Sequence, residues 1–218
     1  MSLDTLLSML IRATVDTAYM VGLSTALTVL FGLPLGVFLI LTDRGGLLSA
    51  PWLHQVLGAV VNVGRSLPFI ILLVAVIPLT RLIVGTSIGT TAAIVPLTLA
   101  AVPFFARVCE TSLREVDHGL VEAAQAMGCT EAQIVYKVLI PEALPSLVLG
   151  VTITIISLLS YSAVAGAVGA GGLGDLAIRY GYQRFDTKVM AVTVALLIVM
   201  VQVIQWIGNW FSRRLRVG

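Results

Sequence analysis

The chain has 218 residues, of which 58% are hydrophobic and 11% are charged. Soluble domains carry about 25% charged residues, and a mean hydropathy of +1.04 indicates an integral membrane protein of one domain instead. The formal net charge of +2 is too small to indicate a nucleic-acid-binding protein. We therefore expect membrane lipid around the chain and no nucleic acid among its partners.

Five apolar segments are long enough to cross a bilayer, which requires about 20 residues per helix. The expected spans are residues 19–41, 57–78, 91–108, 144–165 and 189–211. The sequence therefore predicts an all-α integral membrane protein in which five transmembrane helices form a single domain, residues 1–218.

The segment before the first span, residues 1–16, lacks the basic start that is typical of a signal peptide. Its apolar residues at helical spacing are Leu3, Leu6, Leu7, Leu10 and Ile11. This spacing predicts an amphipathic helix at the membrane interface. Within the first span, Gly32 and Gly36 form a G-x-x-x-G pattern that would permit close contact with another helix.

The second expected span contains an arginine, Arg65. Starting the span at Ser66 would leave 15 uncharged residues before Arg81, which is about 22 Å of helix and too short for a core of ~30 Å. One interpretation places Arg65 at the headgroups. The other places it toward the bundle interior or the solute path, because charge inside a membrane is costly without a use. Pro68 is expected to distort the helix just beyond.

Hydroxyl groups form a stripe along the fourth expected span, at Thr154, Ser157 and Tyr161. The favoured interpretation is hydrogen bonding between helices, and the alternative is that they line the path. The candidates for the translocation path are Arg65, Ser66, Ser157 and Tyr161.

A glycine-rich segment, residues 166–184, follows this span. Gly169, Gly171 and Gly174 match the G-x-G-x-x-G pattern of dinucleotide-binding folds. We reject that interpretation because the preceding apolar run has the length of a membrane span and no acid follows after about 20 residues. A flexible turn, or a re-entrant segment that closes a cavity, fits better.

The most polar long segment is Glu122–Pro141, within a region that holds six of the 11 acids. Apolar runs lie on both sides of it, so residues 109–143 are expected to form an aqueous loop. It is either an amphipathic helix on the membrane surface or a docking element for a partner.

Two short helices with a bend are predicted in this loop. The first has an apolar face at positions i, i+4 and i+7, formed by Leu120, Ala124 and Met127. Gly128 is expected to follow it in a left-handed conformation. Thr130 and Gln133 have the spacing of a capping box that starts the second helix. We expect Pro141 to end that helix.

The loop resembles the EAA loop of type I binding-protein-dependent ABC importer permeases. That family has E-A-A, three residues, glycine, nine residues and I-x-L-P, and the spacing here is the same. Val138 and Ile140 replace the usual Ile and Leu of the last element. The resemblance implies a cytoplasmic helical coupling loop that inserts into a groove of a separate ATPase subunit. The coupling residues that it implies are Glu122, Ala123, Ala124, Met127, Gly128 and Pro141.

Further stretches, residues 62–89, 92–98, 103–107 and 166–185, resemble the permease of the D- and L-methionine ABC uptake system. The resemblance implies a homodimeric permease, two ATPase subunits and an extracytoplasmic methionine-binding protein. It also implies a location in the bacterial plasma (inner) membrane. The substrate rests wholly on this resemblance, because no residue in the sequence indicates recognition of a thioether. The same type of permease for another amino acid, or a stand-alone channel or secondary carrier, stays an alternative.

The remaining patterns concern orientation and chemistry. Arg65 is left out of the count of basic residues. The side of the membrane with the polar loop and the C-terminus then carries seven, and the opposite side carries five. This bias predicts a cytoplasmic C-terminus and an N-terminus outside.

Neither lysine, Lys137 or Lys188, follows a glycine, so a Walker A motif is absent. We therefore expect a transport subunit that is not an enzyme and has no cofactor. We also expect no metal site, because His54 and His118 are far apart in the sequence.

Overall fold

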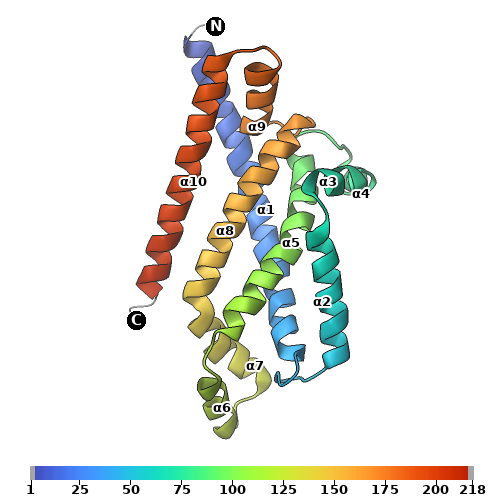
Figure 1. The fold of residues 1–218 in the computed structure, drawn as a ribbon, viewed down its shortest axis with the longest axis vertical. Coiled ribbons are helices and arrows are strands. Elements are labelled where there is room, and N and C mark those ends of the chain that lie inside the picture. The colour runs from blue at the N-terminus through green and yellow to red at the C-terminus, as the bar shows by residue number, and fades with distance from the viewer. Residues whose placement is uncertain (1–2, 216–218) are drawn as a thin grey trace.

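A computed structural model describes residues 3–215, and within this range the protein is helical and has no β-strand (Figure 1). Four helices are long and apolar enough to cross a membrane. They are α1 (Leu3–Thr42), α5 (Thr90–Arg114), α8 (Ile140–Ala167) and α10 (Thr187–Leu215). A bent pair, α2 (Pro51–Ser66) with α3 (Phe69–Ala75), brings the number of candidate crossings to five. The prediction of an all-α membrane protein is confirmed.

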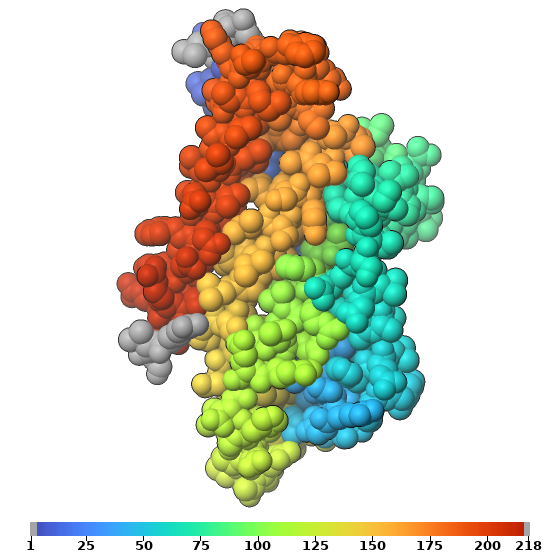
Figure 2. Space-filling model, viewed as in Figure 1, coloured from blue at the N-terminus to red at the C-terminus, as the bar shows by residue number. Residues whose placement is uncertain are grey.

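The long helices run side by side, with α10 along one side of the molecule and α2, α3 and α4 (Ile77–Val84) along the other (Figures 1 and 2). The polar loop, residues 115–139, forms the tip of the molecule at the end opposite the N-terminus. The fold therefore keeps the loop away from the apolar sides of the bundle.

The central contact of the bundle is between α1 and α5. A Cβ atom at Gly32 would lie 2.9 Å from Cδ1 of Phe105, and one at Gly36 would lie 2.8 Å from the carbonyl oxygen of Ala106. Both distances are too short for ordinary packing, so only glycine allows this approach. The two glycines do permit close helix contact, and their partner is a helix of the same chain.

The first helix differs from its prediction. Residues 3–42 form one continuous helix of about 60 Å, so the interfacial helix expected at residues 1–16 is wrong for the described residues. Leu10 and Ala13 pack in a buried cluster with Leu173, and Thr17 Oγ1 accepts a hydrogen bond of 2.9 Å from the Leu173 N–H. These contacts bury Leu10 and part of Leu6, whereas Leu7 and Ile11 of the same apolar face stay exposed.

The second expected span, residues 57–78, is interrupted. After Ser66, Leu67 is extended (φ −81°, ψ 124°), and α3 leaves the break at an angle of 101° to α2. Proline has no N–H to donate and disfavours a helical conformation in the residue before it. Pro68 therefore divides the segment, where the sequence predicted only a distortion.

The glycine-rich segment is largely helical, in contrast to the flexible turn that we expected. It forms α9 (Gly172–Leu176) and a π-helical turn, η2 (Ala177–Tyr182). Leu173 is fully buried, and a side chain at Gly174 would collide with the backbone of Ala163 in α8. The glycines here allow close packing of α9 between α1, α8 and α10.

The contact between α1 and α5 predicts that Gly36→Leu will destabilise the fold by about 1–3 kcal/mol, the usual cost of overpacking. Gly22→Leu is the matched control, because a Cβ at this position of α1 meets nothing within 4 Å. Thermal unfolding of the purified variants in detergent measures both effects. A melting temperature of Gly36→Leu equal to that of Gly22→Leu would contradict the packing described here.

Candidate coupling loop and translocation path

The polar loop begins with a capped helix and a left-handed glycine. Helix α6 (His118–Ala126) starts after Asp117, whose Oδ1 accepts a hydrogen bond of 2.7 Å from the Gly119 N–H. Gly128 follows the end of the helix with φ +76°, and the Cys129 N–H donates to the Ala124 carbonyl at 3.1 Å. Side chains rarely tolerate this backbone conformation, so the predicted role of Gly128 in the bend is confirmed.

The second helix of the loop starts at the predicted capping box. Thr130 Oγ1 accepts from the Gln133 N–H at 3.3 Å, and the Thr130 N–H donates to Gln133 Oε1 at 2.9 Å. These two bonds satisfy N–H groups that the start of a helix leaves free. Helix α7 (Glu131–Ile134) is therefore fixed relative to the glycine that precedes it.

The prediction that Pro141 ends this helix is wrong. Helix α7 passes into a π-helical turn, η1 (Val135–Leu139), and then directly into α8, with Pro141 in the first turn of α8. The Ile140 N–H donates to the Val135 carbonyl five residues earlier. Proline has no N–H to donate to a carbonyl of the preceding turn. The wider π-helical turn accommodates Pro141, so the helix continues through this position. The second half of the loop is thus continuous with a membrane-crossing helix.

The expected apolar face of α6 is divided between the interior and the surface. Ala124 is 2% exposed and packs in one cluster with Ile134 and Leu139. Leu120 and Met127 are 44% and 77% exposed. Glu122 and Ala123 are exposed as well. We call the four exposed residues Leu120, Glu122, Ala123 and Met127 the coupling surface. A surface with two large apolar side chains outside the bundle indicates a protein contact.

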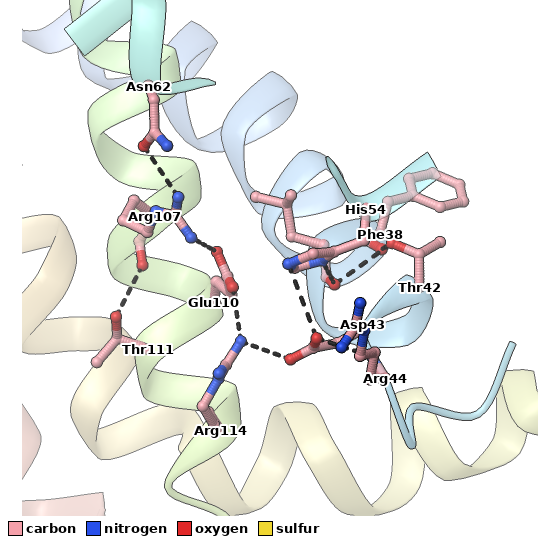
Figure 3. Close-up of polar contacts among 11 residues, drawn as sticks. Phe38, Thr42, Asp43, Arg44, His54, Asn62, Arg107, Glu110, Thr111 and Arg114 are labelled. Carbon is pink, nitrogen blue, oxygen red and sulfur yellow. Dashed lines mark hydrogen bonds and ion pairs between the residues drawn. The ribbon is translucent and has the colours of Figure 1, made fainter. Parts of the chain in front are cut away.

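A network of charged side chains joins the neighbouring helices close to this loop (Figure 3). At its centre lies Glu110 of α5, whose side chain is only 3% exposed. One carboxylate oxygen accepts from Arg107 at 2.6 Å, and the other accepts from Arg114 at 2.8 Å. Two charge-assisted bonds compensate the cost of burying the acid.

The network extends from α5 to two other elements. Arg107 Nη2 donates to Asn62 Oδ1 of α2 at 2.9 Å, and Arg114 Nη2 donates to Asp43 Oδ2 in the α1–α2 loop at 2.7 Å (Figure 3). The other oxygen of Asp43 lies 3.8 Å from Nε2 of His54. The end of α5 that leads into α6 is thereby tied to α1 and α2.

A groove of about 410 Å³ separates the network from the loop. Its polar lining residues include Asp43, Arg44, Arg114, His118, Glu122 and Gln125. Glu122 therefore belongs both to the coupling surface and to a groove that basic side chains also line.

Two of the four candidates for the translocation path line the same cavity, and Ser66 and Ser157 are not among its lining residues. Arg65 and Tyr161 line a cavity of about 130 Å³ beside the break between α2 and α3. Phe69 and Phe104, which no sequence pattern had singled out, line it as well. The Ser66 and Ser157 hydroxyls donate to the carbonyls of Asn62 and Ile153, four residues earlier on their own helices, at 2.7 and 3.0 Å.

The hydroxyl stripe of α8 does not join helices through its threonine and serine. The Thr154 hydroxyl donates to the Gly150 carbonyl of the same helix at 2.8 Å, as Ser157 does to Ile153. Hydroxyls on helices often bond to carbonyls in this way. The favoured interpretation of interhelical hydrogen bonds is therefore wrong for these two residues.

Part of the network could have been found in the sequence. Glu110 lies three residues after Arg107 and four before Arg114, which is the spacing of ion pairs on a helix. Asp43 and Asn62 carry no such signal because only the fold brings them to α5. Within residues 3–215, no group of three or more His, Cys, Asp and Glu side chains could hold a metal ion, and Cys109 and Cys129 are free.

Comparisons with known proteins agree with this architecture. A family model described as the binding-protein-dependent transport system inner membrane component matches residues 32–217. The probable D-methionine transport system permease protein MetI of Vibrio cholerae is 59% identical over 206 residues, which cover 94% of this chain and 92% of that protein. The methionine import system permease protein MetP of Bacillus subtilis is 42% identical, with coverage of 91% and 89%.

Solved structures show the same fold. A chain from an inward-facing structure of the MetNI methionine ABC transporter is 48% identical, and the superposition has a TM-score of 0.96 and covers 99% of both chains. A chain of an amino acid ABC transporter crystallised with histidines is 22% identical, with a TM-score of 0.77 over 95% and 94% of the chains, which shows a shared fold alone. With most of its length matched by the family model and by relatives of high identity, the chain belongs to the family of binding-protein-dependent transport system inner membrane components.

Proposed function

We propose that the chain is the membrane-spanning subunit of an ATP-driven ABC importer that takes up D- and L-methionine. The observation that carries this proposal is the likeness, over nearly the whole chain, to D-methionine permeases and to a chain of the MetNI methionine transporter. Two copies of the chain form a homodimer, and an extracytoplasmic methionine-binding protein delivers the solute. The importer lies in the bacterial plasma membrane.

The energy for transport comes from a separate subunit. The sequence has no Walker A motif, so the chain does not hydrolyse ATP. Two ATPase subunits bind the homodimer, one at each coupling surface. The exposed Met127 and Leu120 supply apolar contacts, and Glu122 supplies a charged one.

The proposed orientation places the coupling loop and the C-terminus in the cytoplasm and the N-terminus outside. Two observations support it. The side with the loop carries seven basic residues against five on the other side. The loop also lies at the end of the molecule opposite the N-terminus (Figure 1).

Motion of the ATPases reaches the membrane through both halves of the loop. Helix α6 follows α5 after a short turn, and α7 continues through η1 into α8. Gly128 holds α6 and α7 at a fixed bend, and the π-helical turn before Pro141 makes α7 and α8 one lever. A displacement of the coupling surface therefore moves α5 and α8 together, and alternating access follows when the two subunits rock against each other.

The charged network carries the same displacement to α2. Glu110 holds Arg107 and Arg114, and these bind Asn62 and Asp43. When α5 moves, α2 and the end of α1 move with it. The break between α2 and α3 is thereby linked to the ATPase, although no residue of α2 belongs to the coupling surface.

The proposed function predicts ATP-dependent uptake by the complete system. Proteoliposomes with the permease, the ATPase and the binding protein should accumulate labelled methionine, whereas vesicles without the ATPase or with a non-hydrolysable ATP analogue should not. Uptake that persists without the ATPase would support a channel or secondary carrier. ATP-dependent uptake of another amino acid in place of methionine would support the alternative permease.

The coupling surface predicts loss of the ATPase from two variants. Gly128→Pro should release it, because proline cannot adopt a φ of +76°. Glu122→Lys should weaken binding by reversing an exposed charge. Co-purification of the ATPase with the tagged permease measures both effects. Asp4→Lys, which reverses an exposed acid far from the loop, is the control and should retain the ATPase. Full recovery with both loop variants would disprove the docking role.

The network predicts that Glu110→Gln will lower the stability of the permease. The change leaves two arginines without their shared carboxylate, and we expect a loss of about 1–3 kcal/mol because the arginines are partly exposed. Glu115→Gln is the control, since this exposed acid accepts only a long bond of 3.4 Å from Ser146, which glutamine can also accept. Thermal unfolding in detergent compares them. Equal melting temperatures would show that the Glu110 carboxylate stabilises nothing.

A further inference from the structure

A cavity lies where the break between α2 and α3 meets α5 and α8. Its volume is about 130 Å³, and its lining residues are Gly64, Arg65, Leu67, Phe69, Ala100, Phe104 and Tyr161. Since a water molecule occupies about 30 Å³ of liquid, the cavity can hold about four waters or one end of a small solute. Only the tertiary structure assembles it, because its walls come from separate segments.

The cavity lies at about half the depth of the membrane. On α2, Arg65 lies eleven residues beyond His54, about 17 Å along the helix, and three residues beyond Asn62, where the charged network ends. Ala100 and Phe104 flank the middle of α5, which has 25 residues. In a hydrocarbon core of about 30 Å, this level is near the midplane. On this placement we favour the solute path over the headgroups for Arg65.

Arg65 has no partner in this position. Among the residues that the structure describes, its guanidinium forms no ion pair, whereas Arg107 and Arg114 each bind a carboxylate. It is exposed in the single subunit. An unpaired charge at this depth is costly unless it faces water or an anionic ligand. The observation therefore points to a polar path or a ligand beside Arg65.

The opposite walls of the cavity are aromatic. The rings of Phe69 and Tyr161 stack with their centroids 4.8 Å apart and an interplanar angle of 11°, and Phe104 lines the same space. Aromatic rings bind apolar groups and make favourable contacts with thioether sulfur. A cation beside three aromatic side chains suits a solute that has a carboxylate at one end and an apolar or thioether group at the other.

We propose that this cavity is a solute site of the permease itself, at which Arg65 binds the carboxylate of the transported amino acid and the aromatic walls contact its side chain. The inference rests on the proposed function and adds a site to it. The C-terminal end of α2, which adjoins the cavity at Gly64, carries partial negative charge and favours the ammonium group. Discontinuous helices place solute sites near the midplane in other transporters for the same electrostatic reasons.

The first test compares uptake with ATP hydrolysis in the same proteoliposomes. Arg65→Gln should reduce methionine uptake about tenfold, as expected for the loss of one charge-assisted carboxylate contact, while the ATPase still co-purifies and hydrolyses ATP. Arg65→Lys keeps the charge and should retain more uptake than Arg65→Gln. Arg81→Gln is the control, because Arg81 bonds to Ser87 outside the cavity and its loss should not change uptake.

The second test detects contact directly. A diazirine analogue of methionine, which retains the carboxylate, is irradiated with the permease–ATPase complex, and labelled peptides are identified by mass spectrometry. We expect labelling of the peptides that contain Phe69 or Tyr161, competition by unlabelled methionine, and weaker labelling in Arg65→Gln and in Phe104→Leu. A merely structural role of Arg65 would not produce competed labelling at these residues.

The outcomes separate this inference from the proposed function. If wild-type vesicles show no ATP-dependent methionine uptake, the proposed function fails. If they show such uptake while Arg65→Gln transports as fast as wild type, or while labelling avoids the cavity, the transporter stands and the solute site is disproved.

Discussion

A hydrocarbon layer offers no water to pair with backbone N–H and C=O groups, and the architecture of this permease depends on that constraint. Every crossing must be helical, and any departure from a helix must be covered by protein or lie at solvent. Three departures matter most for the proposed function. Pro68 divides α2 from α3 beside the cavity that contains Arg65, Gly128 bends the coupling loop, and the π-helical turn before Pro141 joins that loop to α8.

Under the proposed function, transmission from the coupling loop to the membrane requires that separate helices move together. Two kinds of contact achieve this. The loop is covalently continuous with α5 and α8, and the buried Glu110 ties α5 to α2 and to the α1–α2 loop through two arginines. Close packing of Gly32 and Gly36 against α5 adds α1 to the same unit. Packed interfaces of this kind shift as bodies and do not deform continuously, which suits a machine that rocks between two openings.

The sequence predicted the local chemistry of the coupling loop well. The left-handed Gly128 and the capping box of Thr130 and Gln133 depend on residues within one turn of each other, so their geometry is encoded locally. The role of Pro141 was misjudged, because a π-helical turn is an adjustment of several residues that the proline itself does not signal. The extent of the first helix was misjudged for another reason: Leu10 and Ala13 pack against residues of α9 and α10, and no pattern within residues 1–16 can show that contact.

By itself, the sequence determined the class of the molecule: apolar segments of membrane length, a patterned polar loop that resembles that of a permease family, and no Walker A motif. These properties follow from composition, periodicity and spacing along the chain. Only the tertiary structure decided that Arg65 meets Phe69, Phe104 and Tyr161 in one cavity, and that Asn62 and Asp43 hold the arginines of α5. Those contacts join residues that are distant in sequence, and they exist because helix packing brings together faces that no local pattern relates.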